Sequence, residues 1–199
     1  MFDAIRSQHF PTQLIPGISA RFEPDSSRFW SLIGPLMDVV FPPFKDIGAY
    51  EMPDDRWQSL QPLRDAFAGC HHEQIVFYEG EKPVGWSYGD MRDSVTFFMT
   101  NTGILPAYRG RGIYTAFLKH YLSYLDTLGY ERVVSNHQTN NRAVIIAKLK
   151  TGFNITAVNL DERWGAQVEL TYLFDDDRRR GYERAFALEH RDMPVSHYP

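Results

Sequence analysis

The sequence predicts a single mixed α/β domain, with a central sheet of about seven strands flanked by helices. Three observations support this fold class. The chain has 199 residues, a length that suits one domain rather than two. Hydrophobic residues make up 43% of it, which is enough for a packed core. Segments with strand and helix periodicity then follow one another in the order β-α-α-β-β-β-α-β-α-β-β, without any internal repeat.

The first half of the chain is predicted to contain three strands and two helices. Residues 1–17 are interpreted as an N-terminal extension, strands are expected over 18–22, 75–78 and 84–88, and helices over 26–40 and 54–68. Gly34-Pro35 is expected to kink or divide the first helix, and Pro62 to kink or restart the second. Three prolines indicate an irregular loop over 41–53.

The second half is predicted to contain four strands and three helices. Strands are expected over 95–100, 132–135, 154–160 and 168–174, and helices over 113–128, 141–151 and from 175 onward. Gly129 and Gly152 are expected to end the first two helices. Three aspartates at the start of the last helix complement its dipole. The folded domain is therefore expected to span 18–174, followed by a C-terminal helix and tail over 175–199.

Composition and charge exclude several classes of protein. Lys and Arg number 21 and Asp and Glu 25, for a net charge of −4, which disfavours a nucleic-acid partner. No run of 18 apolar residues predicts a membrane span, and the first residues do not resemble a signal peptide. Cys70 is the only cysteine, so no intrachain disulfide can form. These observations favour a cytoplasmic protein.

A glycine- and arginine-rich loop over 104–113 follows a predicted strand and opens a predicted helix. Unpaired N–H groups and the dipole at a helix start attract anions, the glycines allow close approach to the backbone, and two arginines supply counter-charge. The segment is neither a Walker loop nor a dinucleotide fingerprint. It predicts a phosphate or pyrophosphate site, although a solvated helix entry would explain these residues alone.

Two motifs resemble those of a known family. Residues 106–113, read as Pro-x-Tyr-Arg-Gly-x-Gly-Ile, resemble the acyl-CoA-binding motif of the GNAT N-acetyltransferase superfamily. Asn141 followed by Lys150-Thr151-Gly152-Phe153 is similar to the family's Asn…Lys-x-Gly-Phe segment. The order of elements also matches, so the resemblance covers about 18–174. It implies a GNAT-like splayed sheet, with acetyl-CoA between the strands that end near Thr102 and Asn136.

The resemblance also implies which residues bind the cosubstrate. Backbone groups of Thr102, Gly103 and Ile104 would contact the pantetheine arm, and Asn141 would reach the same molecule from its helix. The pyrophosphate would be wrapped by Arg109, Gly110, Arg111, Gly112, Ile113 and Tyr114. Two positions depart from the family pattern. Tyr114 stands where Gly or Ala is usual, and Lys148 stands where many relatives have a tyrosine as general acid.

The catalytic candidates are therefore Lys148, Tyr114 and His137. Lys148 would stabilise the departing thiolate by its charge, or else it would turn to solvent; Tyr114 is the alternative acid. His137 follows a strand that borders the cofactor cleft, where a neutral imidazole could act as a base or be a hydrogen-bonded structural histidine. Surface roles are expected for Glu73 and Asp90. No metal is expected at residues 70–73, because neighbours in a strand face opposite ways.

The predicted function is N-acetyl transfer from acetyl-CoA to a primary amine of a small molecule or peptide. Direct attack is expected because Cys70 lies outside the motif, with the Ile104 N–H stabilising the oxyanion. A non-catalytic acyl-CoA-binding or sensing module is the alternative, and an unrelated phosphate-binding protein is a third interpretation. The acceptor, the acyl chain length and the oligomeric state, with a homodimer among the options, are left open.

Overall fold

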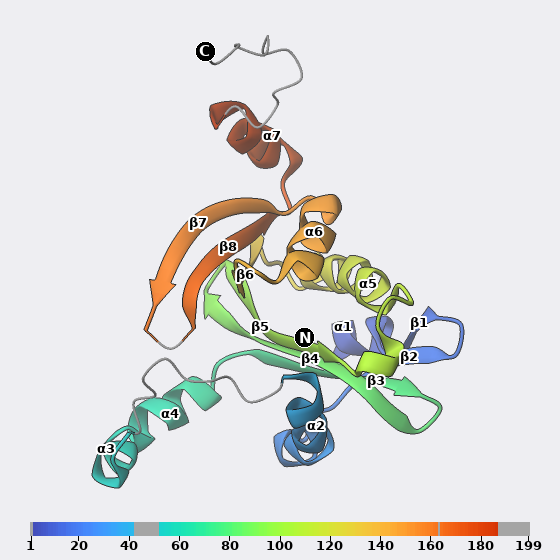
Figure 1. Cartoon of the computed structure of the whole chain (residues 1–199), viewed down its shortest axis with the longest axis vertical. Helices are drawn as coiled ribbons and strands as arrows, with labels where there is room; N and C mark the ends of the chain where they lie inside the picture. The colour runs from blue at the N-terminus through green and yellow to red at the C-terminus, as the bar shows by residue number, and fades with distance from the viewer. Residues whose placement is uncertain (1, 42–51, 163, 187–199) are drawn as a thin grey trace.

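The computed structural model describes residues 2–41, 52–162 and 164–186, which form one mixed sheet between helices (Figure 1). The sheet has eight strands in the order β1-β2-β3-β4-β5-β6-β8-β7. Every neighbouring pair is antiparallel except β5 and β6, which are parallel. The predicted mixed α/β single domain is thus confirmed, with eight strands in place of about seven.

Each predicted helix and strand is present, and most strands are longer than their periodic core. The strands are β1 (Thr12–Ile15), β2 (Ile18–Phe22), β3 (His72–Glu79), β4 (Lys82–Asp93), β5 (Thr96–Ile104), β6 (Arg132–Gln138), β7 (Asn154–Asp161) and β8 (Gly165–Leu173). The helices are α1 (Phe2–His9), α2 (Ser26–Val40), α3 (Asp54–Ser59), α4 (Gln61–Ala68), α5 (Ile113–Thr127), α6 (Arg142–Thr151) and α7 (Asp176–Ala185). Most of the predicted 41–53 loop and the tail after 186 lie outside the described residues.

The segment interpreted as an extension contributes α1 and the additional strand β1, which pairs with β2. Arg6 of α1 places Nη2 2.9 Å from Oε1 of Glu73, which is fully buried and also accepts a hydrogen bond from the Tyr124 hydroxyl at 2.7 Å. The expected surface role of Glu73 is therefore wrong. A buried carboxylate is tolerated here because a guanidinium and a hydroxyl replace its water.

Helices cover both faces of the sheet, with α5 and α6 on one face and α2 on the other (Figure 1). Alternate side chains of β3 enter two separate cores, as the pleat requires. Ile75 and Phe77 belong to the core under α5, and Val76 belongs to the core under α2 together with Trp86 and Phe29. Among the described residues, no helix is long and apolar enough to span a bilayer.

Two prolines have different effects on their helices. α2 continues through Pro35, so the expected division at Gly34-Pro35 is absent. Because Pro35 has no N–H, the carbonyl of Ser31 loses its helical hydrogen-bond donor. Both residues are exposed, so water can donate to that carbonyl instead. In contrast, the second predicted helix is interrupted at Leu60, between α3 and α4, which confirms the restart predicted at Pro62.

The two central strands separate along their length. β5 and β6 pair only at Thr96↔Arg132, Phe97↔Val133 and Phe98↔Val134. Beyond this point β5 follows β4 as far as Ile104, whereas β6 follows β8 as far as Gln138. We call the space between residues 99–104 of β5 and 135–138 of β6 the fork. The inner edges of both strands carry backbone groups that no described strand pairs, as the predicted splay requires.

Candidate active site

The loop that enters α5 exposes its backbone. Gly110 has φ +74° and Gly112 has φ +83°, a left-handed conformation that glycine adopts without strain. Gly112 is the N-cap of α5 and has no side chain to cap the helix, so the first amides of α5 can bind an anion. No atom lies within 4 Å of the position of a Cβ at either glycine. This geometry agrees with the predicted phosphate site.

The two arginines of this loop have different surroundings. Arg109 donates from Nε to the carbonyl of Ile104 at 2.9 Å and from Nη2 to the carbonyl of Val40 at 3.3 Å. Its guanidinium therefore fixes the loop to the ends of β5 and α2. Arg111 is 42% exposed, and its nearest carboxylate, that of Glu79, is 3.8 Å away. Arg111 is thus the guanidinium that is better placed to meet an anion from solvent.

The end of β5 presents main-chain groups to the fork. A Cβ on Gly103 would lie 2.4 Å from the Trp86 ring, so only glycine fits at this position. The N–H of Leu105 donates to Val84 of β4 at 3.0 Å. Because consecutive amides of a strand point to opposite edges, the Ile104 N–H is directed to the open edge. Thr102 lies two residues before Ile104, so by the same alternation its N–H also faces the open edge, while its hydroxyl lies 2.8 Å from that of Ser87.

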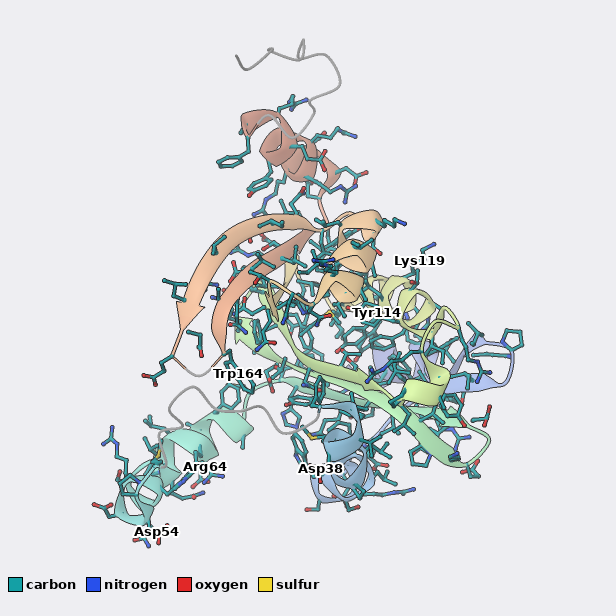
Figure 2. All side chains as sticks on the ribbon, viewed as in Figure 1. Asp38, Asp54, Arg64, Tyr114, Lys119 and Trp164 are labelled. Carbon is teal, nitrogen blue, oxygen red and sulfur yellow. The ribbon has the colours of Figure 1, made fainter. Side chains whose placement is uncertain are left out.

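Asn141 and Tyr114 belong to the starts of α6 and α5, the two helices on one face of the sheet (Figure 1). Asn141 is the exposed N-cap of α6, and its side chain makes no capping hydrogen bond, so it is free to contact a ligand. Tyr114 belongs to the first turn of α5 (Figure 2). It is partly buried, and burial raises the pKa of its phenol. Within the described chain, its hydroxyl makes no hydrogen bond.

Lys148 lies at the apex of the fork. Its side chain is buried, with Nζ 2.6 Å from Oγ of Ser135 on β6 and 3.5 Å from Sδ of Met99 on β5. Ser135 and Met99 are the first residues beyond the last pair between these strands, Phe98↔Val134. The alternative in which Lys148 turns to solvent is therefore wrong. The α6 helix directs the side chain inward, between the two strands.

The charge of Lys148 has little compensation. It forms no ion pair with any carboxylate of the described residues, and Nζ lies 4.4 Å from the centre of the Phe153 ring. Burial lowers the pKa of Lys148 from 10.5 to about 7. The amine can therefore bind or release a proton near neutral pH, which an exposed lysine cannot do.

His137 is connected to Lys148 through Ser135. Nε2 of His137 lies 3.0 Å from the Ser135 hydroxyl, whose oxygen accepts the hydrogen bond from Lys148. The hydroxyl proton is thus available for donation to Nε2. Burial and the neighbouring Lys148 charge lower the pKa of His137 to about 3, so the imidazole is neutral. Ser135 was not predicted from the sequence, where its only signal is a small polar residue in an apolar strand.

Comparisons with known proteins agree with this geometry. Residues 38–153, more than half of the chain, match the model of the acetyltransferase (GNAT) family. A putative acetyltransferase from Salmonella typhimurium, solved with acetyl-CoA, superposes with a TM-score of 0.56 at 16% identity over 80% of this chain and 95% of that one. A GNAT acetyltransferase from Elizabethkingia anophelis, also solved with acetyl-CoA, gives 0.56 at 13% identity over 80% and 100%.

The ribosomal-protein-S18-alanine N-acetyltransferase from Escherichia coli gives a TM-score of 0.59 at 12% identity, over 79% of this chain and 94% of that one. No curated protein matches by sequence. The structural likenesses establish the fold, and the family model adds the motif-bearing segment from the end of α2 to the second residue after α6. The chain therefore belongs to the acetyltransferase (GNAT) family.

Proposed function

We propose that this enzyme transfers the acetyl group of acetyl-CoA to a primary amine of a small molecule or peptide, by direct attack. The observation that carries the proposal is the buried Lys148 at the apex of the fork, without a carboxylate partner in the described chain. Burying an uncompensated cation is costly, and such groups concentrate at functional sites. We include a cytoplasmic location, since Cys70 is the only cysteine and no disulfide can form within the chain.

The residues around the fork fit acetyl-CoA. The uncapped start of α5 and Arg111 suit the diphosphate, while the open edge of β5 and Asn141 suit the pantetheine arm. Acetyl-CoA supplies a thioester, a good acyl donor because a thiol has a pKa of about 8.5 and leaves readily as thiolate. The Ile104 N–H can donate a hydrogen bond to the acetyl oxygen.

Lys148 would stabilise the thiolate by its charge and can also deliver a proton, since its pKa lies at about 7. Tyr114 is the competing acid, because burial keeps its phenol protonated. Two variants separate these roles. A lower turnover rate in Lys148→Met with unchanged acetyl-CoA affinity supports the role of the lysine at the thiolate. A lower turnover rate in Tyr114→Phe would instead make Tyr114 the acid, next to the glycine- and arginine-rich loop over 104–113, which we call the cofactor loop. If both retain the parent rate, water protonates the thiolate.

His137 is the sequence-based candidate for removing the proton of the amine, but a pKa of about 3 makes its imidazole too weak a base for that step. We propose instead that His137 positions the Ser135 hydroxyl, which donates to Nε2 and accepts from Lys148, and that water takes the proton of the amine. We expect His137→Ala to lower turnover by a similar factor at pH 7.5 and pH 9, whereas a loss confined to low pH, where free amine is scarce, would restore His137 as the base. A pH–rate profile that superimposes on the parent profile would remove His137 from the mechanism.

A screen of primary amines for thiol release from acetyl-CoA tests the function itself. The enzyme is expected to release thiol only when a suitable amine is present. If the protein binds acetyl-CoA but releases no thiol with any of the amines, the non-catalytic sensing module is favoured instead. Equal affinity for acetyl-CoA and ATP would favour a general phosphate-binding protein. Calorimetry with both ligands, run beside the screen, separates these outcomes.

A further inference from the structure

The sheet face opposite Lys148 carries hydrogen-bond acceptors at the same fork. Successive residues of β6 face opposite ways, so Asn136 points away from the side on which Ser135 meets Lys148. Oδ1 of Asn136 is buried and accepts no hydrogen bond in the part of the chain that the structure describes. A buried acceptor of this kind is costly unless a ligand or water supplies a donor.

A carboxylate lies beside this fork on the neighbouring strands. The register between β4 and β5 shifts by one residue, so that Asn101 opposes Tyr88 but Phe98 opposes Asp90. The bulged segment of β5 contains Thr100, whose hydroxyl donates to Oδ2 of Asp90 at 2.7 Å. Asp90 is partly buried at the surface of the sheet, as expected of a surface residue.

The charge of Asp90 is not neutralised by a neighbouring cation. Arg92, the next residue on the same face of β4, has Nη1 3.0 Å from the Glu169 carboxylate and is thus already paired. Among the described residues, Asp90 forms no ion pair, and its negative charge contributes with burial to a raised pKa of Tyr88. A cationic group would therefore be attracted to this position.

Aromatic rings form a wall next to Asp90. Tyr88, two residues earlier on β4, packs against Trp30 of α2 with ring centres 5.1 Å apart and nearly perpendicular planes. Trp30 remains 43% exposed although it sits on the helix that covers this face. A large aromatic surface beside a carboxylate suits a ligand with a flat apolar body and an ammonium group.

We propose that this face is the acceptor subsite, and that it selects a primary amine attached to an aromatic body, through Trp30, Tyr88, Asp90 and Asn136. The inference rests on the proposed amine acetylation and specifies its substrate class. The ring would pack on Trp30 and Tyr88, and the ammonium would approach Asp90. Once water has taken one proton from the ammonium, a remaining N–H would donate to Asn136 Oδ1. The acceptor then enters from the face opposite Lys148, and its nitrogen meets the acyl carbon between the two strands.

Matched amines and matched variants test this subsite. 2-Phenylethylamine is compared with propylamine, which has no ring, by thiol release from acetyl-CoA in the parent, Trp30→Ala and Asp90→Asn. Trp57→Ala removes a similarly exposed tryptophan from α3, and Asp38→Asn removes an exposed carboxylate from α2 (Figure 2). Calorimetry measures acetyl-CoA affinity in each variant, and also the binding of 2-phenylethylamine, which does not depend on turnover.

We expect the parent to prefer 2-phenylethylamine by about tenfold in kcat/KM, and Trp30→Ala to abolish that preference. Asp90→Asn should raise KM for both amines about tenfold, while acetyl-CoA affinity and kcat stay unchanged. The asparagine oxygen can still accept the hydrogen bond from Thr100, so the local structure is retained. The two control variants should match the parent. Equal use of both amines, or unchanged KM and amine binding in Asp90→Asn, overturns the subsite. If 2-phenylethylamine binds through Asp90 but no amine is acetylated, the subsite stands and the proposed transfer fails.

Discussion

Replacing Lys148 by methionine should stabilise the folded protein while removing its reactive amine. Burial lowers the pKa of Lys148 from 10.5 to about 7. At about 1.4 kcal/mol per pH unit, this corresponds to a cost of about 5 kcal/mol for keeping the ammonium buried at pH 7 or below. Methionine fills a similar volume without charge, but it leaves the Ser135 hydroxyl without its donor. We therefore expect a gain of roughly 2–4 kcal/mol in the free energy of unfolding at pH 7.

The pH dependence gives the sharper test. Between about pH 7 and pH 10.5 the unfolded chain holds a proton on Lys148 that the folded chain has released, so parent stability rises with pH across this range. Lys148→Met lacks this rise, and its advantage should shrink toward pH 10.5. Urea unfolding followed by tryptophan fluorescence at pH 7 and pH 9.5 measures both quantities, with the exposed Lys119→Met of α5 as control (Figure 2). A Lys148→Met variant that is less stable than the parent at pH 7, or that shows the same pH slope, would refute this reasoning.

Three further substitutions test the site and the fold. Gly112→Asp should weaken acetyl-CoA binding at least tenfold, about 1.4 kcal/mol, relative to the isosteric Gly112→Asn, which tolerates the same φ of +83°; equal affinities by calorimetry would contradict the assigned diphosphate site. Gly103→Ala should cost roughly 1–3 kcal/mol of stability, because its Cβ would meet the Trp86 ring at 2.4 Å, and an unchanged urea midpoint would argue against this packing. Glu73→Gln should cost roughly 3 kcal/mol, because it leaves Arg6 with the exposed Asp3 as its carboxylate partner and without the buried one; thermal melting should show partial recovery with Arg6→Met added, and additive losses would disprove the coupling.

Features written in a short stretch of sequence could be predicted well. The cofactor loop joins a strand end, two glycines and a helix start within ten residues, and Gly110 and Gly112 indeed have positive φ. The helix ends at Gly129 and Gly152 follow from equally local signals, since both glycines adopt left-handed conformations. The predicted splay depended on the family resemblance, and it is confirmed by the short pairing of β5 with β6.

Features that depend on distant contacts could not be predicted from the residues themselves. Lys148 is buried because β5 and β6 separate just beyond the pair Phe98↔Val134. No local sequence pattern indicates where two strands separate. Glu73 resembled a surface residue because its partner Arg6 lies in a segment interpreted as an extension. Ser135 gains its importance only through contacts with a helix and with the residue two positions along its strand.

The central claim is that the fork holds the acetyl donor against Lys148. The most direct test is kcat for thiol release at saturating acetyl-CoA in the parent and in Lys148→Met, with an amine that the parent acetylates, together with the acetyl-CoA affinity of both. We predict that kcat falls by about 10²–10³, the loss typical of a group that stabilises developing negative charge, while affinity changes less than about threefold. Parent-like turnover by a folded Lys148→Met variant would contradict the claim.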